Sequence, residues 1–155
     1  MYGRAFKPHL TIALIIEHEG RFLMVEEFQD TGERCFGIPA GHVDAKESIL
    51  EAAVREGLEE TGCEIELEHL VGIYDYVKEK DTIIRFTFKA RLKDNDPTKA
   101  HPADPDGDIL AVHWMTREEI NNRKSQWRTR LVGSSFDDYD KGQNFPLSLI
   151  TTVRG

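Results

Sequence analysis

The sequence predicts an α/β fold in which a mixed β-sheet is sandwiched between helices. Two observations support this prediction. Short runs rich in β-branched and aromatic residues recur along the chain, and two segments between them carry helix-capping patterns. Strands mixed with a few helices on one core are typical of the α/β class. Because 155 residues is the length of one domain, we expect a single domain over residues 1–155.

The first third of the chain predicts a hairpin followed by a tight loop. Residues 9–16 are rich in β-branched residues and predict a buried strand. After a turn at Glu19-Gly20, residues 21–25 predict the second arm of the hairpin. Residues 36–41 contain Pro39 and two glycines, which indicates a loop without regular structure.

A helix is predicted over residues 45–61. Asp44 and Glu47 have the spacing of a capping box, and Gly62 stands where a glycine would end the helix. A helix turns by about 100° per residue, which places Leu50, Val54 and Leu58 in one apolar stripe. The small residues Ala53 and Gly57 flank this stripe and would permit close approach to a sheet.

The second half of the chain predicts three more strands and further helices. The expected strands cover residues 70–77, 82–88 and 109–115, with a hairpin turn at 78–81 and an acidic loop over 94–108. Thr116 and Glu119 have the capping-box pattern of a second helix. Short helices are expected near residues 126–132 and 147–153.

Composition narrows the class of protein. The net charge of −8 argues against a nucleic-acid duplex as partner. No apolar run approaches the roughly 20 residues that span a bilayer, and residues 1–8 lack the apolar segment of a secretory signal. Cys35 and Cys63 are too few for a disulfide framework. We therefore expect a cytoplasmic protein without a membrane partner.

Three carboxylates crowd one edge of the predicted helix. Glu56, Glu59 and Glu60 share an arc of about 100° in its last turn. Like charges at this spacing, near the negative end of the helix dipole, destabilise a helix. A divalent cation would reverse the sign of that interaction, and oxygen ligands suit Mg²⁺ or Mn²⁺. The alternative is a solvated acidic face.

The spacing around these acids resembles the signature of the Nudix hydrolases. Gly41 is followed after five residues by Glu47, and after seven more by Arg55-Glu56-Gly57-Leu58-Glu59-Glu60-Thr61-Gly62. All seven invariant positions match, a coincidence of about one in 10⁸ at a given start point. Gly57 and Cys63 depart from the pattern at two apolar positions.

The resemblance implies a Nudix fold and a role for each matching residue. The expected metal ligands are Glu56, Glu59, Glu60 and the carbonyl of Ala40, holding Mg²⁺, for which Mn²⁺ can substitute. The expected catalytic residues are Glu59, Glu56, Glu47 and Arg55, with Glu47 and Arg55 mainly orienting the loop and helix. The expected substrate-binding residues are Arg85, Arg128, Ala40 and Gly41.

Outside the signature, several side chains have two interpretations each. Arg85 either faces outward or enters a cleft, and Arg128 and Arg130 beside Trp127 either contact substrate or lie on a surface helix. Each of a further set of residues is either a site residue, with an acidic, hydrogen-bonding or stacking role, or a residue with an ordinary structural role. They are Asp104, Asp106, Asp108, His9, His42, Tyr74 and Trp114.

The chain also resembles the NudJ-type phosphatase subfamily over nearly its whole length, for instance at Arg85-Phe86 and at residues 142–147. This implies Mg²⁺-dependent hydrolysis of a small nucleoside di- or triphosphate, or of a thiamine-pyrimidine-type diphosphate, by a monomer. The main alternative is a silent Nudix-fold module that binds a nucleotide or nucleotide-sugar. An isoprenoid diphosphate isomerase using Cys35 is a second alternative, and a calcium-binding structural protein a third, although residues 94–108 lack the EF-hand order of ligands.

Overall fold

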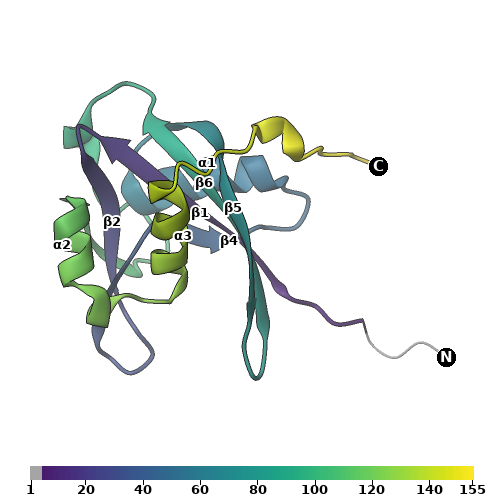
Figure 1. Ribbon diagram of the computed structural model, residues 1–155, viewed down its shortest axis with the longest axis horizontal. Helices are drawn as coiled ribbons and strands as arrows, with labels where there is room; N and C mark the ends of the chain where they lie inside the picture. The colour runs from purple at the N-terminus through teal and green to yellow at the C-terminus, as the bar shows by residue number, and fades with distance from the viewer. Residues whose placement is uncertain (1–4) are drawn as a thin grey trace.

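A computed structural model describes residues 5–155 and shows a mixed seven-stranded sheet with helices packed on it (Figure 1). Part of the segment searched for a secretory signal, residues 1–4, lies outside the described residues. The strands run in the order β3-β2-β1-β6-β5, with β4 paired to β1 and β7 paired to β2. Their bounds are β1 His9–His18, β2 Arg21–Phe28, β3 Arg34–Gly37, β4 Ala40–His42, β5 Ile65–Val77, β6 Thr82–Leu92 and β7 Ile109–Met115.

Strand β1 is the centre of the sheet, and its two faces belong to two hydrophobic clusters. Ile12, Leu14 and Ile16 join a cluster that includes the helix α1 (Ile49–Thr61), because side chains alternate across a strand. Ala13 and Ile15 join the other cluster, beneath α3 (Leu131–Asp140). The two helices therefore cover opposite faces (Figure 1), which confirms the expected α/β arrangement.

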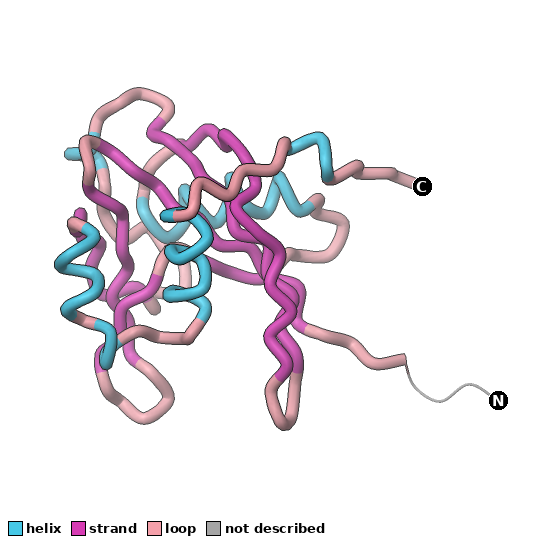
Figure 2. The backbone as a smooth tube through the Cα atoms, in the orientation of Figure 1, coloured by secondary structure: helices cyan, strands magenta, loops and turns pink. Residues whose placement is uncertain are grey.

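The order of the strands makes the sheet mixed. β1 pairs with β6 in parallel over eight residues, from His9↔Ile83 to Ile16↔Ala90, whereas the other strand pairs are antiparallel. β5 and β6 form a long hairpin whose end projects from the body of the molecule (Figure 2). Within residues 5–155, no helix has the length and apolar character needed to cross a membrane.

Helix α1 ends as predicted but begins later. Gly62 has a left-handed φ of 72° and closes the helix. The capping box is formed by Ser48 and Glu51, whose side chains each bind the other's backbone N–H at 3.0 and 2.9 Å. The prediction that Asp44 caps the helix is wrong, because Asp44 and Glu47 form a separate turn before it.

The predicted close approach of α1 to the sheet at Ala53 and Gly57 is confirmed, but two residues of the apolar stripe are exposed. Val54 and Leu58 are 44% and 47% exposed, whereas Ala53 and Gly57 are buried. A Cβ on Gly57 would lie 3.0 Å from Ile65 and 3.1 Å from Leu14. The glycine that departs from the family pattern therefore lets the helix approach the sheet closely. As a result, the small residues face the sheet and part of the apolar stripe faces solvent.

Three further expectations need correction. Residues 36–41 are not wholly irregular, because β3 ends at Gly37 and β4 begins at Ala40, on either side of Ile38-Pro39. The helix expected at residues 126–132 is instead a 3₁₀ turn at Lys124–Gln126 followed by α3. Near the end of the chain only a 3₁₀ turn at Leu147–Leu149 forms. The second capped helix, α2 (Arg117–Asn122), begins at the Thr116–Glu119 capping box, as predicted.

Candidate active site

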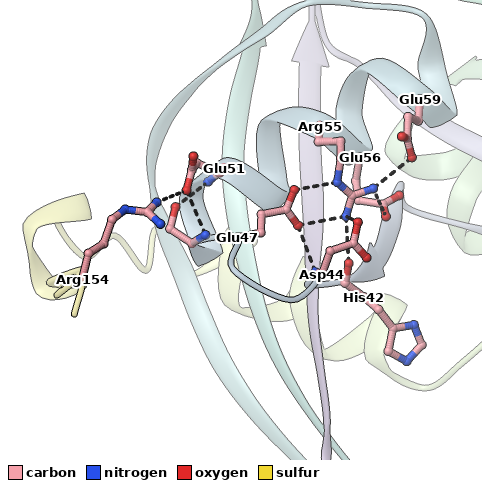
Figure 3. A network of polar contacts seen from close by, with 9 residues as sticks. His42, Asp44, Glu47, Glu51, Arg55, Glu56, Glu59 and Arg154 are labelled. Atoms are coloured by element: carbon pink, nitrogen blue, oxygen red, sulfur yellow. Dashed lines mark hydrogen bonds and ion pairs between the residues drawn. The ribbon is translucent and has the colours of Figure 1, made fainter.

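Arg55 of α1 is the centre of a polar network that joins the helix to the chain before it (Figure 3). Its guanidinium donates to both carboxylate oxygens of Glu47 at 2.7 and 3.0 Å and to the carbonyl of His42 at 2.9 Å. One nitrogen, Nη1, also donates to Glu56 and Glu59, each at 3.0 Å. These bonds raise the pKa of Arg55, and the bond from Arg55 lowers the pKa of Glu47. Arg55 and Glu47 thus orient the loop and the helix relative to each other.

Glu60 and Glu56 are the poorly solvated carboxylates of the cluster. The Oε1 atom of Glu60 accepts the backbone N–H of Ala40 at 2.9 Å. Burial nevertheless raises the pKa of Glu60 to about 8, with a contribution from neighbouring Glu56. Burial also raises the pKa of Glu56, although Arg55 opposes the shift. The site therefore concentrates negative charge that the described side chains only partly compensate.

Gly41 is required by the position of Glu56. A Cβ built on Gly41 would lie 2.2 Å from the carboxylate carbon of Glu56 and 2.2 and 2.5 Å from its oxygens. Any side chain at this position would compete with the carboxylate for the same space. The glycine at the entrance of the signature is thus explained by the close approach of strand β4 to helix α1.

We expect Gly41→Ala to inactivate the protein without unfolding it. The atoms in the way are the end of a flexible side chain, so Glu56 can turn aside at little cost in stability. A displacement of about 1 Å at a reacting group lowers kcat on the order of 10²-fold. Phosphate-release kinetics and thermal melting measure the two effects. Gly155→Ala is the control for the activity, because nothing lies within 4 Å of its added Cβ and its backbone is not in the left-handed region. A Gly41→Ala protein with unchanged kcat would contradict this account.

A cavity of about 510 Å³ lies beside this network. It brings together most of the side chains that the sequence singled out, from the loop before α1, from α1 and β6, and from the segment before α3. Acidic side chains outnumber arginines in its lining. The acids are Glu27, Asp44, Glu56, Glu59, Glu60, Asp104, Asp106 and Asp108, and the arginines are Arg55, Arg85 and Arg128. Ala40 and Gly41 also line it, whereas Glu47 does not and instead binds Arg55 and the backbone N–H of Asp44.

Arg85 enters the cavity from β6 rather than facing outward. Its Nε donates to the Thr11 hydroxyl at 3.1 Å. Burial and the neighbouring positive charge of Arg128 lower the pKa of Arg85 to about 10, while Glu60 opposes the shift. A partly desolvated arginine beside a second arginine is well suited to bind an anion.

Arg128 is held by its backbone and by an acid that the sequence analysis did not identify. Its N–H donates to the carbonyl of Phe36 at 2.8 Å, and its guanidinium forms an ion pair with Glu27. Burial raises the pKa of Glu27, although Arg128 opposes the shift. Glu27 lies at the end of β2, beyond the predicted strand over 21–25. Two consecutive acids after an apolar strand were the only signal in the sequence that pointed to it.

The acidic loop before β7 folds around Asp104. The Asp104 carboxylate accepts the N–H groups of Asp106 at 3.2 Å and Asp108 at 2.9 Å. Asp104 therefore shapes the loop, as the solvated-turn interpretation held. All three aspartates also line the cavity, as the site interpretation held. The two interpretations are compatible.

The other candidates divide between the site and the core. His42 lines the cavity, whereas His9 lies beyond it and contacts His42 at 3.2 Å between ring nitrogens. Trp114 donates to the carbonyl of Pro97 and packs against the core. The Tyr74 hydroxyl donates to Asp138 at 2.8 Å. Cys35 is free and buried, and burial raises its pKa, which disfavours a reactive thiolate.

The carboxylates of Glu56, Glu59 and Glu60 are chemically suited to a hard divalent cation, but they do not converge on one point in the structure. Glu56, Glu59 and Glu60 offer only oxygen ligands, as Mg²⁺ and Mn²⁺ prefer. Across residues 5–155, no three acidic, histidine or cysteine side chains converge closely enough to hold a metal ion. Glu56 and Glu59 instead share Nη1 of Arg55. Metal binding therefore requires these two carboxylates to turn from the arginine toward Glu60.

Comparison with known proteins gives consistent matches. The sequence model of the NUDIX domain matches residues 7–132. The chain is 38% identical over 146 residues to the phosphatase NudJ of Escherichia coli K12, covering 94% of this chain and 92% of that protein. A NUDIX hydrolase from Nitrosomonas europaea superposes with a TM-score of 0.85 at 34% identity, over 95% of this chain and 98% of the other.

A more distant structure shows the fold alone. It is the bifunctional NMN adenylyltransferase/ADP ribose pyrophosphatase of Francisella tularensis, in complex with AMP and a Mn ion. It has a TM-score of 0.71 at 19% identity, over 90% of this chain and 43% of that protein.

Proposed function

Because this chain belongs to the Nudix hydrolase family, we propose that it hydrolyses a phosphoanhydride bond in a small nucleoside di- or triphosphate or a thiamine-pyrimidine-type diphosphate. The observation that most supports this function is that negative and positive side chains line the same cavity. Glu56, Glu59 and Glu60 supply carboxylates, and Arg85 and Arg128 supply cations. A diphosphate bound with a divalent cation requires both kinds of charge at once. The NudJ phosphatases share 38% of the aligned residues, which favours the same reaction class.

In this proposal the three glutamates and the carbonyl of Ala40 hold Mg²⁺, with Mn²⁺ as a substitute. The ion would neutralise phosphate oxygens and lower the pKa of the attacking water. Glu60 is kept in place by the Ala40 N–H, and Gly41 leaves room for Glu56. The first contact fixes the Glu60 carboxylate before substrate arrives, whereas Glu56 and Glu59 would turn from Arg55 to reach the ion.

Glu59 is the best placed acceptor for the proton of the attacking water. Its side chain is 34% exposed, against 12% for Glu56, so solvent and substrate reach it more easily. Its carboxylate accepts from Nη1 of Arg55 at 3.0 Å and would turn from this contact toward the ion and the attacking water. Arg85 and Arg128 bind the non-bridging oxygens of the phosphate chain and stabilise the charge that develops on them.

Four further statements stay predictions. We expect one domain over residues 1–155, a monomer, a cytoplasmic location and no binding to a nucleic-acid duplex. The net charge of −8 supports the last of these. Gel filtration with light scattering checks the monomer.

The experiment that tests the function is a phosphate-release assay on a panel of nucleoside di- and triphosphates and thiamine-pyrimidine-type diphosphates. We expect release in the presence of Mg²⁺ or Mn²⁺ and none in excess EDTA, with the products identified by mass spectrometry. A silent binding module would bind a nucleotide or nucleotide-sugar in calorimetry and release no phosphate from any member of the panel. That result would overturn the proposal. An isomerase would convert an isoprenoid diphosphate without releasing phosphate.

A further inference from the structure

A second cavity of about 530 Å³ adjoins the first. Residues on the boundary between the two cavities line both of them, and they include both arginines that we assign to the phosphate chain. The shared residues are Thr11, His42, Arg85, Arg128 and Thr129. A phosphate chain held at this boundary leaves two places for the rest of the substrate: among the carboxylates, or in the second cavity.

Strand register explains why the second cavity lies beside the arginine. Directly paired residues project from the same face of a sheet. Thr11 pairs with Arg85 and with His42, which places these three side chains in one row across β6, β1 and β4. Two residues further along the strands, Ile83 pairs with both Tyr76 and His9 and forms the next row. The first row is the boundary, and the second row lies in the second cavity.

The lining of the second cavity differs from that of the first. Tyr76 and Ile83 offer aromatic and apolar surface, with the Lys78 ammonium 5.8 Å from the centre of the Tyr76 ring. Gln29 and Thr31 offer an amide and a hydroxyl that both donate and accept hydrogen bonds. The charges here are mixed: Asp81 lies 3.6 Å from both His9 and Lys78. Carboxylates dominate the first cavity and favour cations or water, whereas this lining favours a flat polar ring. An aliphatic chain would leave the polar groups without partners.

We propose that the second cavity binds the organic group of the substrate, and that this group is a planar nitrogen heterocycle stacked on Tyr76. The inference rests on the proposed function, since it takes the arginines as the site of the phosphate chain. The substrate then lies across the boundary between the two cavities. Its phosphates lie toward Glu56, Glu59 and Glu60, and its ring lies beside Tyr76 and Ile83 of the β5–β6 hairpin. Tyr76 sets specificity and takes no part in the chemistry.

Calorimetry with two ligands tests the proposal without requiring turnover. Uridine 5′-monophosphate and ribose 5-phosphate share a phosphate and a sugar but differ by the heterocycle. In Mg²⁺, we expect the wild-type protein to bind the nucleotide about tenfold more tightly, since stacking on an aromatic side chain supplies an advantage of this order. Tyr76→Ala should erase the difference and leave the affinity for ribose 5-phosphate unchanged. Tyr76→Phe should keep it.

Two other variants sharpen the comparison. Val77 is 70% exposed and adjoins Tyr76 on β5, where it projects to the opposite face. Val77→Ala should therefore leave both affinities unchanged. Thr31→Leu, on an exposed loop, fills part of the cavity from outside without adding an aromatic face and should weaken nucleotide binding alone. It replaces Tyr76→Ala if that variant does not fold.

The outcomes separate the two proposals. A wild-type protein that binds the nucleotide no better than ribose 5-phosphate, including no binding of either, overturns the assignment of the heterocycle. The same holds if Tyr76→Ala keeps the difference. If no diphosphate yields phosphate, the proposed function fails, while the calorimetric comparison still decides what the second cavity binds.

Discussion

A Glu59→Gln protein is expected to release phosphate on the order of 10³-fold more slowly than the wild type, with KM little changed. Glutamine has the same shape but neither accepts a proton from water nor offers a negative charge to a cation. The amide oxygen can still accept from Nη1 of Arg55, which the carboxylate does at 3.0 Å. The free energy of unfolding should therefore change by less than about 1 kcal/mol.

Glu64→Gln is the matched control for this variant. Glu64 is exposed just beyond the end of α1 and outside the cavity, and its replacement removes the same single charge. We expect it to keep full activity. If Glu59→Gln retains more than about a tenth of the wild-type kcat, neither the proton-acceptor role nor the ligand role of Glu59 can hold.

A Glu60→Gln protein should lose activity by a similar factor and gain stability when no metal is present. The Ala40 N–H still finds an acceptor on the amide, while the charge that burial disfavours is gone. Kinetics in Mg²⁺ and thermal melting in EDTA measure the two effects. Metal should stabilise the wild type more than the variant.

The gain in stability of the metal-free Glu60→Gln protein should increase with pH. Burial raises the pKa of Glu60 from 4.5 to about 8 in the folded protein. Between these values the unfolded chain loses the proton that the folded protein keeps, so rising pH destabilises the metal-free wild type by up to about 1.4 kcal/mol per pH unit. The variant lacks this loss. Its advantage should be absent near pH 4 and largest above pH 8, and a gain that does not vary with pH would contradict the assignment.

The sequence predicted the elements whose signals are local. The β7 strand follows its apolar run, α2 begins at its capping box, and Gly62 ends α1 through its left-handed backbone. The resemblance to the Nudix signature also implied that Arg55 and Glu47 orient the loop and the helix, and the two side chains do form an ion pair. Such features need only neighbouring residues to form.

What the sequence did not predict depends on contacts between distant segments. The helical wheel grouped Leu50, Val54 and Leu58 in one apolar stripe, but Val54 and Leu58 are exposed in the structure. The close contact of Gly57 with Leu14 and Ile65 turned the small face inward. Glu27 belongs to the site only because β2 and the segment before α3 meet there, 101 residues apart in sequence. No local pattern contains that pairing.

Binding of Mn²⁺, followed by electron paramagnetic resonance, tests most directly whether the crowded glutamates hold a cation. Titration of the wild type should show bound Mn²⁺ that Mg²⁺ displaces, and Glu64→Gln should behave in the same way. A protein with both Glu59→Gln and Glu60→Gln should show no such binding. Equal Mn²⁺ affinity and stoichiometry in this double variant would mean that the cation is bound elsewhere, and the proposed chemistry would lose its basis.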